Sequence, residues 1–115
     1  MNSIKHIEKP WGYEKILEQN KKYVLKKLFM KKGFQCSLQY HEEKTETIYL
    51  LNGTMKLTMG DKNKLTEYIV NEEGFSITIK PFEIHRMTAL TDILYLEAST
   101  PELEDVIRLE DDFGR

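Results

Sequence analysis

Residues 33–53 read GFQCSLQYHEEKTETIYLLNG, with a glycine at each end. Glycine often marks a tight turn, and two strand-like segments lie between these glycines. They are residues 37–41, SLQYH, and residues 46–51, ETIYLL. Because successive side chains of a strand point to opposite faces, each segment presents its alternate residues on a common face. The stretch therefore predicts two β-strands and a fold built from sheets.

Three side chains of this stretch are suited to a metal ion. Gln39 and His41 fall on one face of the first segment, and Glu46 opens the second. If the two strands are neighbours, an amide oxygen, an imidazole and a carboxylate converge, which makes a partial shell for a divalent metal. Residues 74–85, GFSITIKPFEIH, form a similar block that ends in His85, and this histidine could complete the shell.

The composition limits the class of protein. The chain has 115 residues, 40% hydrophobic and 31% charged, which fits one domain, residues 1–115. A net charge of −2 gives no field that would attract nucleic acid. The single cysteine, Cys36, excludes an intramolecular disulfide and is interpreted as a small buried side chain. Without an apolar run of membrane-spanning length or a signal-peptide pattern, a cytoplasmic protein with no membrane partner is expected.

The remaining sequence adds short strands separated by turn residues. Residues 54–59 and 64–70 flank the polar turn GDKN and predict a hairpin. Residues 87–89 and 93–98 predict two late strands. About ten short strands with regular turns indicate an all-β sandwich or barrel. From Pro101 onward the pattern changes, and this segment is expected to be either a short helix or an extended lid.

Two features near the N-terminus leave alternatives open. In KPWG, residues 9–12, proline and glycine bracket the only tryptophan, Trp11, which is either presented by a fixed loop or covers one mouth of the core. Residues 23–32 alternate so that Lys26 and Lys27 fall on opposite faces, each among apolar side chains. One of these lysines could serve a polar pocket, or both could reach water through their long stems.

The two histidine-containing blocks resemble the two motifs of the cupin superfamily. The first motif is Gly, five residues, His-x-His, three or four residues, Glu, six residues, Gly. The chain keeps every spacing, with glutamine in place of the first histidine; the matching residues are Gly33, Gln39, His41, Glu46 and Gly53. In the second motif Gly74 and His85 keep their places, whereas Lys80 and Phe82 stand where proline and glycine are usual.

The outer blocks are similar to a narrower family, the type II phosphomannose isomerase domain. That family reads Arg/Lys-Pro-Trp-Gly, Val-Lys-Arg-Ile, Ser-Leu-Gln-x-His, x-His-Arg and Asp-Ile-Val-Arg-x-Glu-Asp-x-Tyr-Gly-Arg. The corresponding segments here are residues 9–12, 25–28, 37–41, 84–86 and 105–115. Where the family often reads Gln-x-His-His-His-Arg-x-Glu-His, this chain carries Glu42, Glu43 and Thr47 in place of three histidines.

The resemblance implies a cupin jelly roll, an all-β sandwich or barrel, with a short C-terminal segment. It also implies a metal-dependent isomerase that interconverts mannose 6-phosphate and fructose 6-phosphate. The family domain usually follows a mannose-1-phosphate guanylyltransferase, but this sequence holds no Gly-rich phosphate loop, so nucleotide-sugar synthesis is not expected. Two alternatives stay open: another cupin epimerase or isomerase acting on a sugar or nucleotide-sugar, and a non-catalytic sugar-binding cupin.

The resemblance and the residue chemistry together suggest roles for individual side chains. One divalent ion is expected, zinc as the first choice and otherwise manganese, cobalt, iron or nickel. Its expected ligands are Gln39, His41, Glu46 and His85. The candidate catalytic residues are Glu46, Lys26 and Glu83, and the residues expected to bind a phosphosugar are Lys9, Tyr40, Arg108 and Arg115. A homodimer is expected because pairing covers sheet edges, and residues 4–9 are the segment that could cross to the partner.

Overall fold

The computed structural model describes residues 1–71 and 76–115, and every regular element in them is a β-strand. In chain order the strands are β1 (Lys5–Lys9), β2 (Gly12–Gln19), β3 (Val24–Met30), β4 (Leu38–Tyr40), β5 (Glu46–Asn52), β6 (Thr54–Gly60), β7 (Leu65–Asn71), β8 (Ser76–Ile79), β9 (Ile84–Ala89), β10 (Ile93–Ser99) and β11 (Ile107–Glu110). The predicted all-β class is confirmed. Gly74, the glycine of the second motif, lies outside the described residues.

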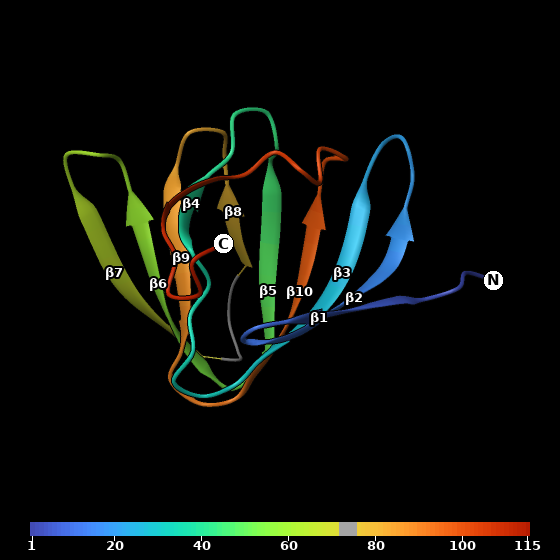
Figure 1. The fold of residues 1–115 in the computed structure, drawn as a ribbon, viewed down its shortest axis with the longest axis horizontal. Coiled ribbons are helices and arrows are strands. Elements are labelled where there is room, and N and C mark those ends of the chain that lie inside the picture. The colour runs from blue at the N-terminus through green and yellow to red at the C-terminus, as the bar shows by residue number, and fades with distance from the viewer. Residues whose placement is uncertain (72–75) are drawn as a thin grey trace.

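The strands form two antiparallel sheets that face each other. The six-stranded sheet has the order β1-β2-β3-β10-β5-β8, and the five-stranded sheet has the order β11-β4-β9-β6-β7. Figure 1 shows them as two walls, with β7, β6, β9 and β4 on one side and β5, β10, β3 and β2 on the other. The interior between two such faces is filled by alternate residues of each strand.

Strict alternation decides what enters this interior. In β3 the inward residues are Val24, Lys26, Leu28 and Met30, and in β10 they are Ile93, Tyr95, Glu97 and Ser99. Lys26, not Lys27, is therefore the lysine that points inward. It lies directly across from Glu97 in the β3–β10 ladder, so the apolar core gives way to charged side chains at this level of the sandwich.

The two strands of the first motif are not neighbours, which corrects the arrangement considered from the sequence. β4 pairs with β9 and β11 in one sheet, whereas β5 pairs with β10 and β8 in the other. The chain crosses between the sheets at residues 41–45. There the Asp105 carboxylate accepts the backbone N–H groups of Glu42, Glu43 and Lys44 at 3.0, 2.7 and 2.8 Å. The motif residues thus meet across the interior and not along a ladder.

The C-terminal segment is extended and not helical. After Pro101 it crosses from the end of β10 to the five-stranded sheet, where β11 pairs with β4 (Figure 1). On the way, Leu103 and Val106 reach the cavity between the sheets, which agrees with the lid alternative. No helix long and apolar enough to cross a membrane occurs in residues 1–71 and 76–115.

Candidate metal centre and active-site cavity

A buried cluster of two histidines and one glutamate lies between the sheets. His41 follows β4, Glu46 begins β5 and His85 belongs to β9. Their ligand atoms all lie within 4.8 Å of one another, and the Nε2 atoms of His41 and His85 lie 3.4 and 3.1 Å from Glu46 Oε1. All three side chains are at most 2% exposed. Three buried donor atoms at this spacing can hold one metal ion.

Backbone acceptors fix the orientation of both imidazoles. His41 Nδ1 donates to the carbonyl of Asp105, and His85 Nδ1 donates to the carbonyl of Glu83 at 3.0 Å. Because Nδ1 carries the hydrogen, each Nε2 directs a lone pair toward the cluster. Neither Nε2 finds a hydrogen-bond partner among the described residues. An oriented imidazole with a free, buried nitrogen is the usual state of a metal ligand, so the residues fit a divalent ion.

The expected fourth ligand, Gln39, lies beside this cluster. It is the register partner of His85 in the β4–β9 pair, and its side chain lines the cavity. Its Oε1 accepts a hydrogen bond from Ser37 Oγ, which orients the amide and leaves the oxygen a second lone pair. Ligation by Gln39 stays a prediction.

Lys44 holds the other oxygen of the cluster carboxylate. Its Nζ lies 3.2 Å from Glu46 Oε2 and 3.9 Å from Glu97 Oε2. Burial alone would raise the pKa of Glu46, but the adjacent His41 and His85 imidazoles and the Lys44 charge lower it well below its usual value. Burial would likewise lower the pKa of Lys44, and the charges of Glu97 and Glu46 raise it. Glu46 therefore stays ionised and presents Oε1 to a metal.

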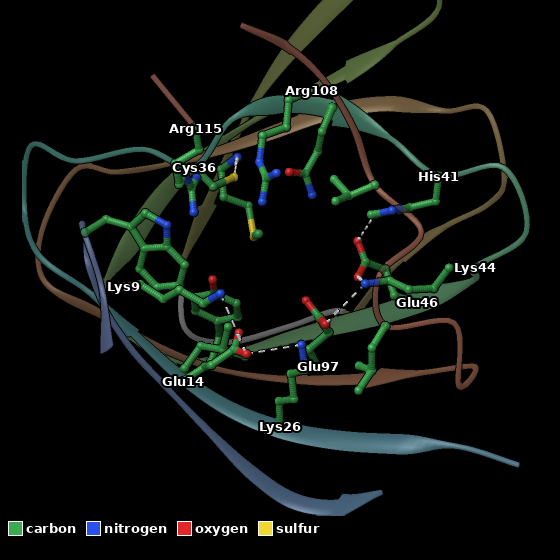
Figure 2. A pocket seen from close by; sticks show the side chains of 17 residues that line it. Lys9, Glu14, Lys26, Cys36, His41, Lys44, Glu46, Glu97, Arg108 and Arg115 are labelled. Atoms are coloured by element: carbon green, nitrogen blue, oxygen red, sulfur yellow. Dashed lines mark hydrogen bonds and ion pairs between the residues drawn. The ribbon is translucent and has the colours of Figure 1, made fainter. Parts of the chain in front are cut away.

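A row of alternating charges continues along the cavity from this lysine. Burial, followed by repulsion from Glu46, raises the pKa of Glu97 to about 7. Glu97 is followed by Lys26, whose Nζ lies 3.5 Å from Glu14 Oε1, and Lys9 Nζ lies 3.9 Å from the same oxygen. Figure 2 shows this row running from His41 and Glu46 past Glu97 to Glu14. It brings fixed donors and acceptors against one side of the cavity.

Cations gather at the opposite end of the cavity. Figure 2 shows Lys9 and Arg115 across the open space from His41 and Glu46, with Arg108 pointing inward between them. Arg115 Nε lies 3.0 Å from Asp111 Oδ2, whereas the Arg108 side chain has no ion pair with any described residue. Burial lowers the pKa of Lys9, and the nearby positive charges lower it further, despite the opposing effect of Glu14. This end is suited to an anion.

Most of the residues expected from the sequence meet in this one cavity. Those that line it are Lys9, Lys26, Gln39, His41, Glu46, Arg108 and Arg115, and His85 joins them through the cluster. Two of the expected residues, Glu83 and Tyr40, do not line this cavity. The Glu83 carboxylate turns back to accept the Lys80 N–H at 2.8 Å and lines a different surface hollow, so only its carbonyl serves the site. Tyr40 alternates to the other face of β4, where its ring packs 6.1 Å from Phe82.

The sequence interpretation missed three charged residues of the cavity, Glu14, Lys44 and Glu97. Glu14 and Glu97 are in phase with the inward apolar residues of β2 and β10, and a charge at such a position is the signal that could have revealed them. Lys44 lies in the crossover, where no periodicity applies. Cys36 is buried as expected, although it borders the cavity, and burial raises the pKa of its thiol to about 11, which disfavours the reactive thiolate.

The three departures from the family pattern lie away from the cavity. Glu42 and Glu43 are exposed, and Thr47 faces outward, where its hydroxyl lies 3.0 Å from that of Thr78. None of the three lines the cavity. The replacement of histidines at these positions therefore leaves the described metal cluster intact.

Comparison with protein families finds a match over residues 1–111 to the family described as mannose-6-phosphate isomerase, C-terminal. Mannose-1-phosphate guanylyltransferase 2 of Escherichia coli O157:H7 is 38% identical over 63 residues, covering 55% of this chain and 13% of that protein. Mannose-1-phosphate guanylyltransferase RfbM of Salmonella typhimurium is 27% identical over 113 residues, covering 94% of this chain and 22% of that protein. The chain thus spans less than a quarter of the length of these relatives.

Solved structures with low sequence identity share the fold. The capsular polysaccharide assembling protein CapF from Staphylococcus aureus superposes with a TM-score of 0.82 at 16% identity, over 96% of this chain and 32% of that one. A structure of Bacillus subtilis oxalate decarboxylase, described with Mn(II) centres, gives 0.74 at 16% identity, over 92% of this chain and 30% of that one. These are cupins, and the predicted cupin fold is confirmed.

Proposed function

The chain belongs to the mannose-6-phosphate isomerase C-terminal family, and from this premise we propose that it interconverts mannose 6-phosphate and fructose 6-phosphate with the help of a divalent metal. One observation carries the proposal. The buried His41–Glu46–His85 cluster and the cationic end, with Arg108 and Arg115, border the same cavity. A phosphosugar has a carbonyl end and a dianionic end, and the cavity offers a complementary group to each.

The two ends of the cavity would bind different parts of the phosphosugar. His41, Glu46 and His85 would hold the ion, with Gln39 as the predicted fourth ligand, and the bound ion would supply a Lewis acid for the sugar carbonyl. Lys9, Arg108 and Arg115 would hold the phosphate at the other end. The sugar would therefore bind with its carbonyl end at the metal and its phosphate at the cationic end. Leu103 and Val106, on the C-terminal segment, would exclude water above it.

A carboxylate between the two ends is placed to move the substrate proton. The isomerisation removes a proton from C2 of the aldose and returns it to C1, while a hydroxyl proton passes from O2 to O1. Glu46 is engaged by His41, His85 and Lys44, which makes it a better ligand than base. Glu97 pairs with Lys44 and lies beside Glu46, but fewer cationic and imidazole groups hold it than hold Glu46, which leaves its carboxylate to accept and return a proton. We assign the proton transfer to Glu97, whereas the sequence interpretation favoured Glu46 for this role and named Glu83 as a weaker candidate.

The direct test is an assay of the purified protein after removal of bound metal with a chelator. Fructose 6-phosphate is expected to form from mannose 6-phosphate when zinc, manganese, cobalt, iron or nickel is returned, and not in its absence. A different phosphosugar product would indicate the epimerase alternative. Binding of mannose 6-phosphate without turnover, with metal present, would indicate the sugar-binding alternative. Either result overturns the proposed reaction.

Substitution of Arg108 tests the orientation of the substrate. Arg108→Met removes the one cation of this end that has no described partner, and KM for mannose 6-phosphate is expected to rise about 10- to 100-fold. The value of kcat should change much less, because the phosphate does not react. Steady-state kinetics measure both, and Lys21→Met, at an exposed turn, is the matched control. An unchanged KM would contradict the placement of the phosphate.

A further inference from the structure

Trp11 combines burial in the core with an unsatisfied hydrogen-bond donor. It is the only tryptophan of the chain, its side chain belongs to the apolar core, and it is 5% exposed. Its indole also lines the active-site cavity. Nε1–H finds no acceptor among the described residues. A buried donor without a partner is costly and rare in a folded protein, so it calls for an explanation.

The backbone holds this tryptophan in place. The carbonyl of Trp11 accepts the N–H of Lys31 at 2.9 Å. The next residue must be glycine, because a Cβ on Gly12 would lie 2.0 Å from the carbonyl oxygen of Phe29. The main chain at Trp11 is therefore held by the tight packing of β2 against β3, and the indole packs in the apolar core beside the cavity.

The other buried groups without partners indicate what the indole lacks. Among the described residues they include His41 Nε2 and His85 Nε2, which face the candidate metal position. The two imidazole nitrogens without partners thus indicate a metal ion as the missing ligand at one end of the cavity. Trp11 lines the same cavity, as do Lys9 and Arg115 (Figure 2). Acceptor oxygens from a ligand would satisfy the indole.

We propose that the indole N–H of Trp11 donates a hydrogen bond to a phosphate oxygen of the bound sugar. The inference rests on the proposed function, because it takes the phosphosugar as the ligand of this cavity. The indole is a donor only, so it accepts nothing from a hydroxyl group and favours an anionic oxygen. Together with Arg108 and Arg115, it would make the phosphate end selective for a tetrahedral oxyanion over an uncharged sugar.

The single tryptophan allows a direct test by NMR. The ¹⁵N-labelled protein gives one indole N–H resonance, which can be followed during titration with mannose 6-phosphate, inorganic phosphate or mannose. We expect a downfield proton shift with the two phosphate ligands, saturating together with the backbone resonances of the cavity, and no such shift with mannose. Backbone shifts without movement of the indole proton, or no response to either phosphate ligand, would overturn the proposal.

A substitution adds the energetic measurement. Trp11→Phe keeps an aromatic ring and removes the donor, so Kd for mannose 6-phosphate should rise about tenfold, as expected for one hydrogen bond to a charged group. Metal content should stay at the wild-type level. An unchanged Kd would overturn the proposal, and if the variant does not fold, the wild-type titration decides alone. An indole shift without isomerase activity would support Trp11 as a phosphate ligand and reject the reaction, so the two failures are distinguishable.

Discussion

Replacing His85 with alanine is expected to abolish stoichiometric binding of a divalent metal. Its Nε2 lies 3.1 Å from Glu46 Oε1 and is oriented by the carbonyl of Glu83, so no neighbouring nitrogen can take over the position. We expect metal affinity to fall by more than about 100-fold, since a direct ligand matters at least as much as the groups that orient it. Isomerase activity should fall with it. Metal content after dialysis against a low, fixed metal concentration measures the effect.

The chain supplies a matched control in its remaining histidine outside the cluster. His6 has a 43% exposed side chain that lies 2.7 Å from Glu8, on β1. His6→Ala should bind metal as well as the wild type does. The β-sheet signal in circular dichroism should persist in both variants, because the apolar core lies mainly at other positions, such as Ile48 and Tyr95. Stoichiometric metal in His85→Ala would refute the cluster as the metal site.

The strand pattern and the metal cluster could be predicted because both follow from short-range spacing. Alternation in β3 and β10 fixes which residues face inward, and it depends only on the two-residue period of a strand. The spacing of His41 and Glu46 within one motif, with His85 in a second motif, is likewise a property of the sequence. The structure brings these three together as expected.

The sheet to which each strand belongs could not be predicted from that spacing. Whether β4 and β5 pair or face each other depends on the crossover at residues 41–45. That crossover is held by Asp105, which is about sixty residues further along the chain. The same long-range contact orients His41 through the Asp105 carbonyl. A local pattern holds no information about a partner at such a distance.

The charged row of the cavity shows the limit of the inward–outward rule. That rule interprets an inward charge as costly, and it identified Lys26 or Lys27 as an exception. Glu14 and Glu97 are exceptions of the same kind, and each is compensated by a nearby cation: Glu14 by Lys26, and Glu97 by Lys44 of the crossover. These ion pairs join residues of β2, β3, β10 and the crossover, so they can be identified only once the arrangement of those segments in space is known.

The metal-free Glu97→Gln variant is expected to gain stability relative to the metal-free wild type as the pH rises. Burial raises the pKa of Glu97 from the usual 4.5 to about 7 in the folded state. Between these values the folded protein holds a proton that the unfolded chain has released. The free energy of unfolding therefore falls as the pH increases. The stabilisation by the protonated carboxyl is fully present below pH 4.5 and is lost as the pH rises through about 7.

The size of this effect follows from the same two pKa values. One pKa unit corresponds to about 1.4 kcal/mol, so the shift in Glu97 amounts to roughly 3 kcal/mol between pH 4.5 and pH 8. Glutamine has nearly the same shape and does not titrate. The difference in unfolding free energy between Glu97→Gln and the wild type should therefore grow in favour of the variant over this range. Isomerase activity should fall at every pH, because glutamine cannot accept the substrate proton.

Denaturant unfolding of the metal-free proteins at a series of pH values measures the difference. Metal must be removed, since an ion beside Glu46 would change the charge that Glu97 experiences. Glu67→Gln is the control, because that side chain on β7 is 61% exposed and pairs with Lys56 of the neighbouring β6. Its difference from the wild type should not depend on pH in this window. A flat or falling difference for Glu97→Gln would mean that Lys44 keeps Glu97 ionised, and that the proton transfer belongs to another group of the cavity.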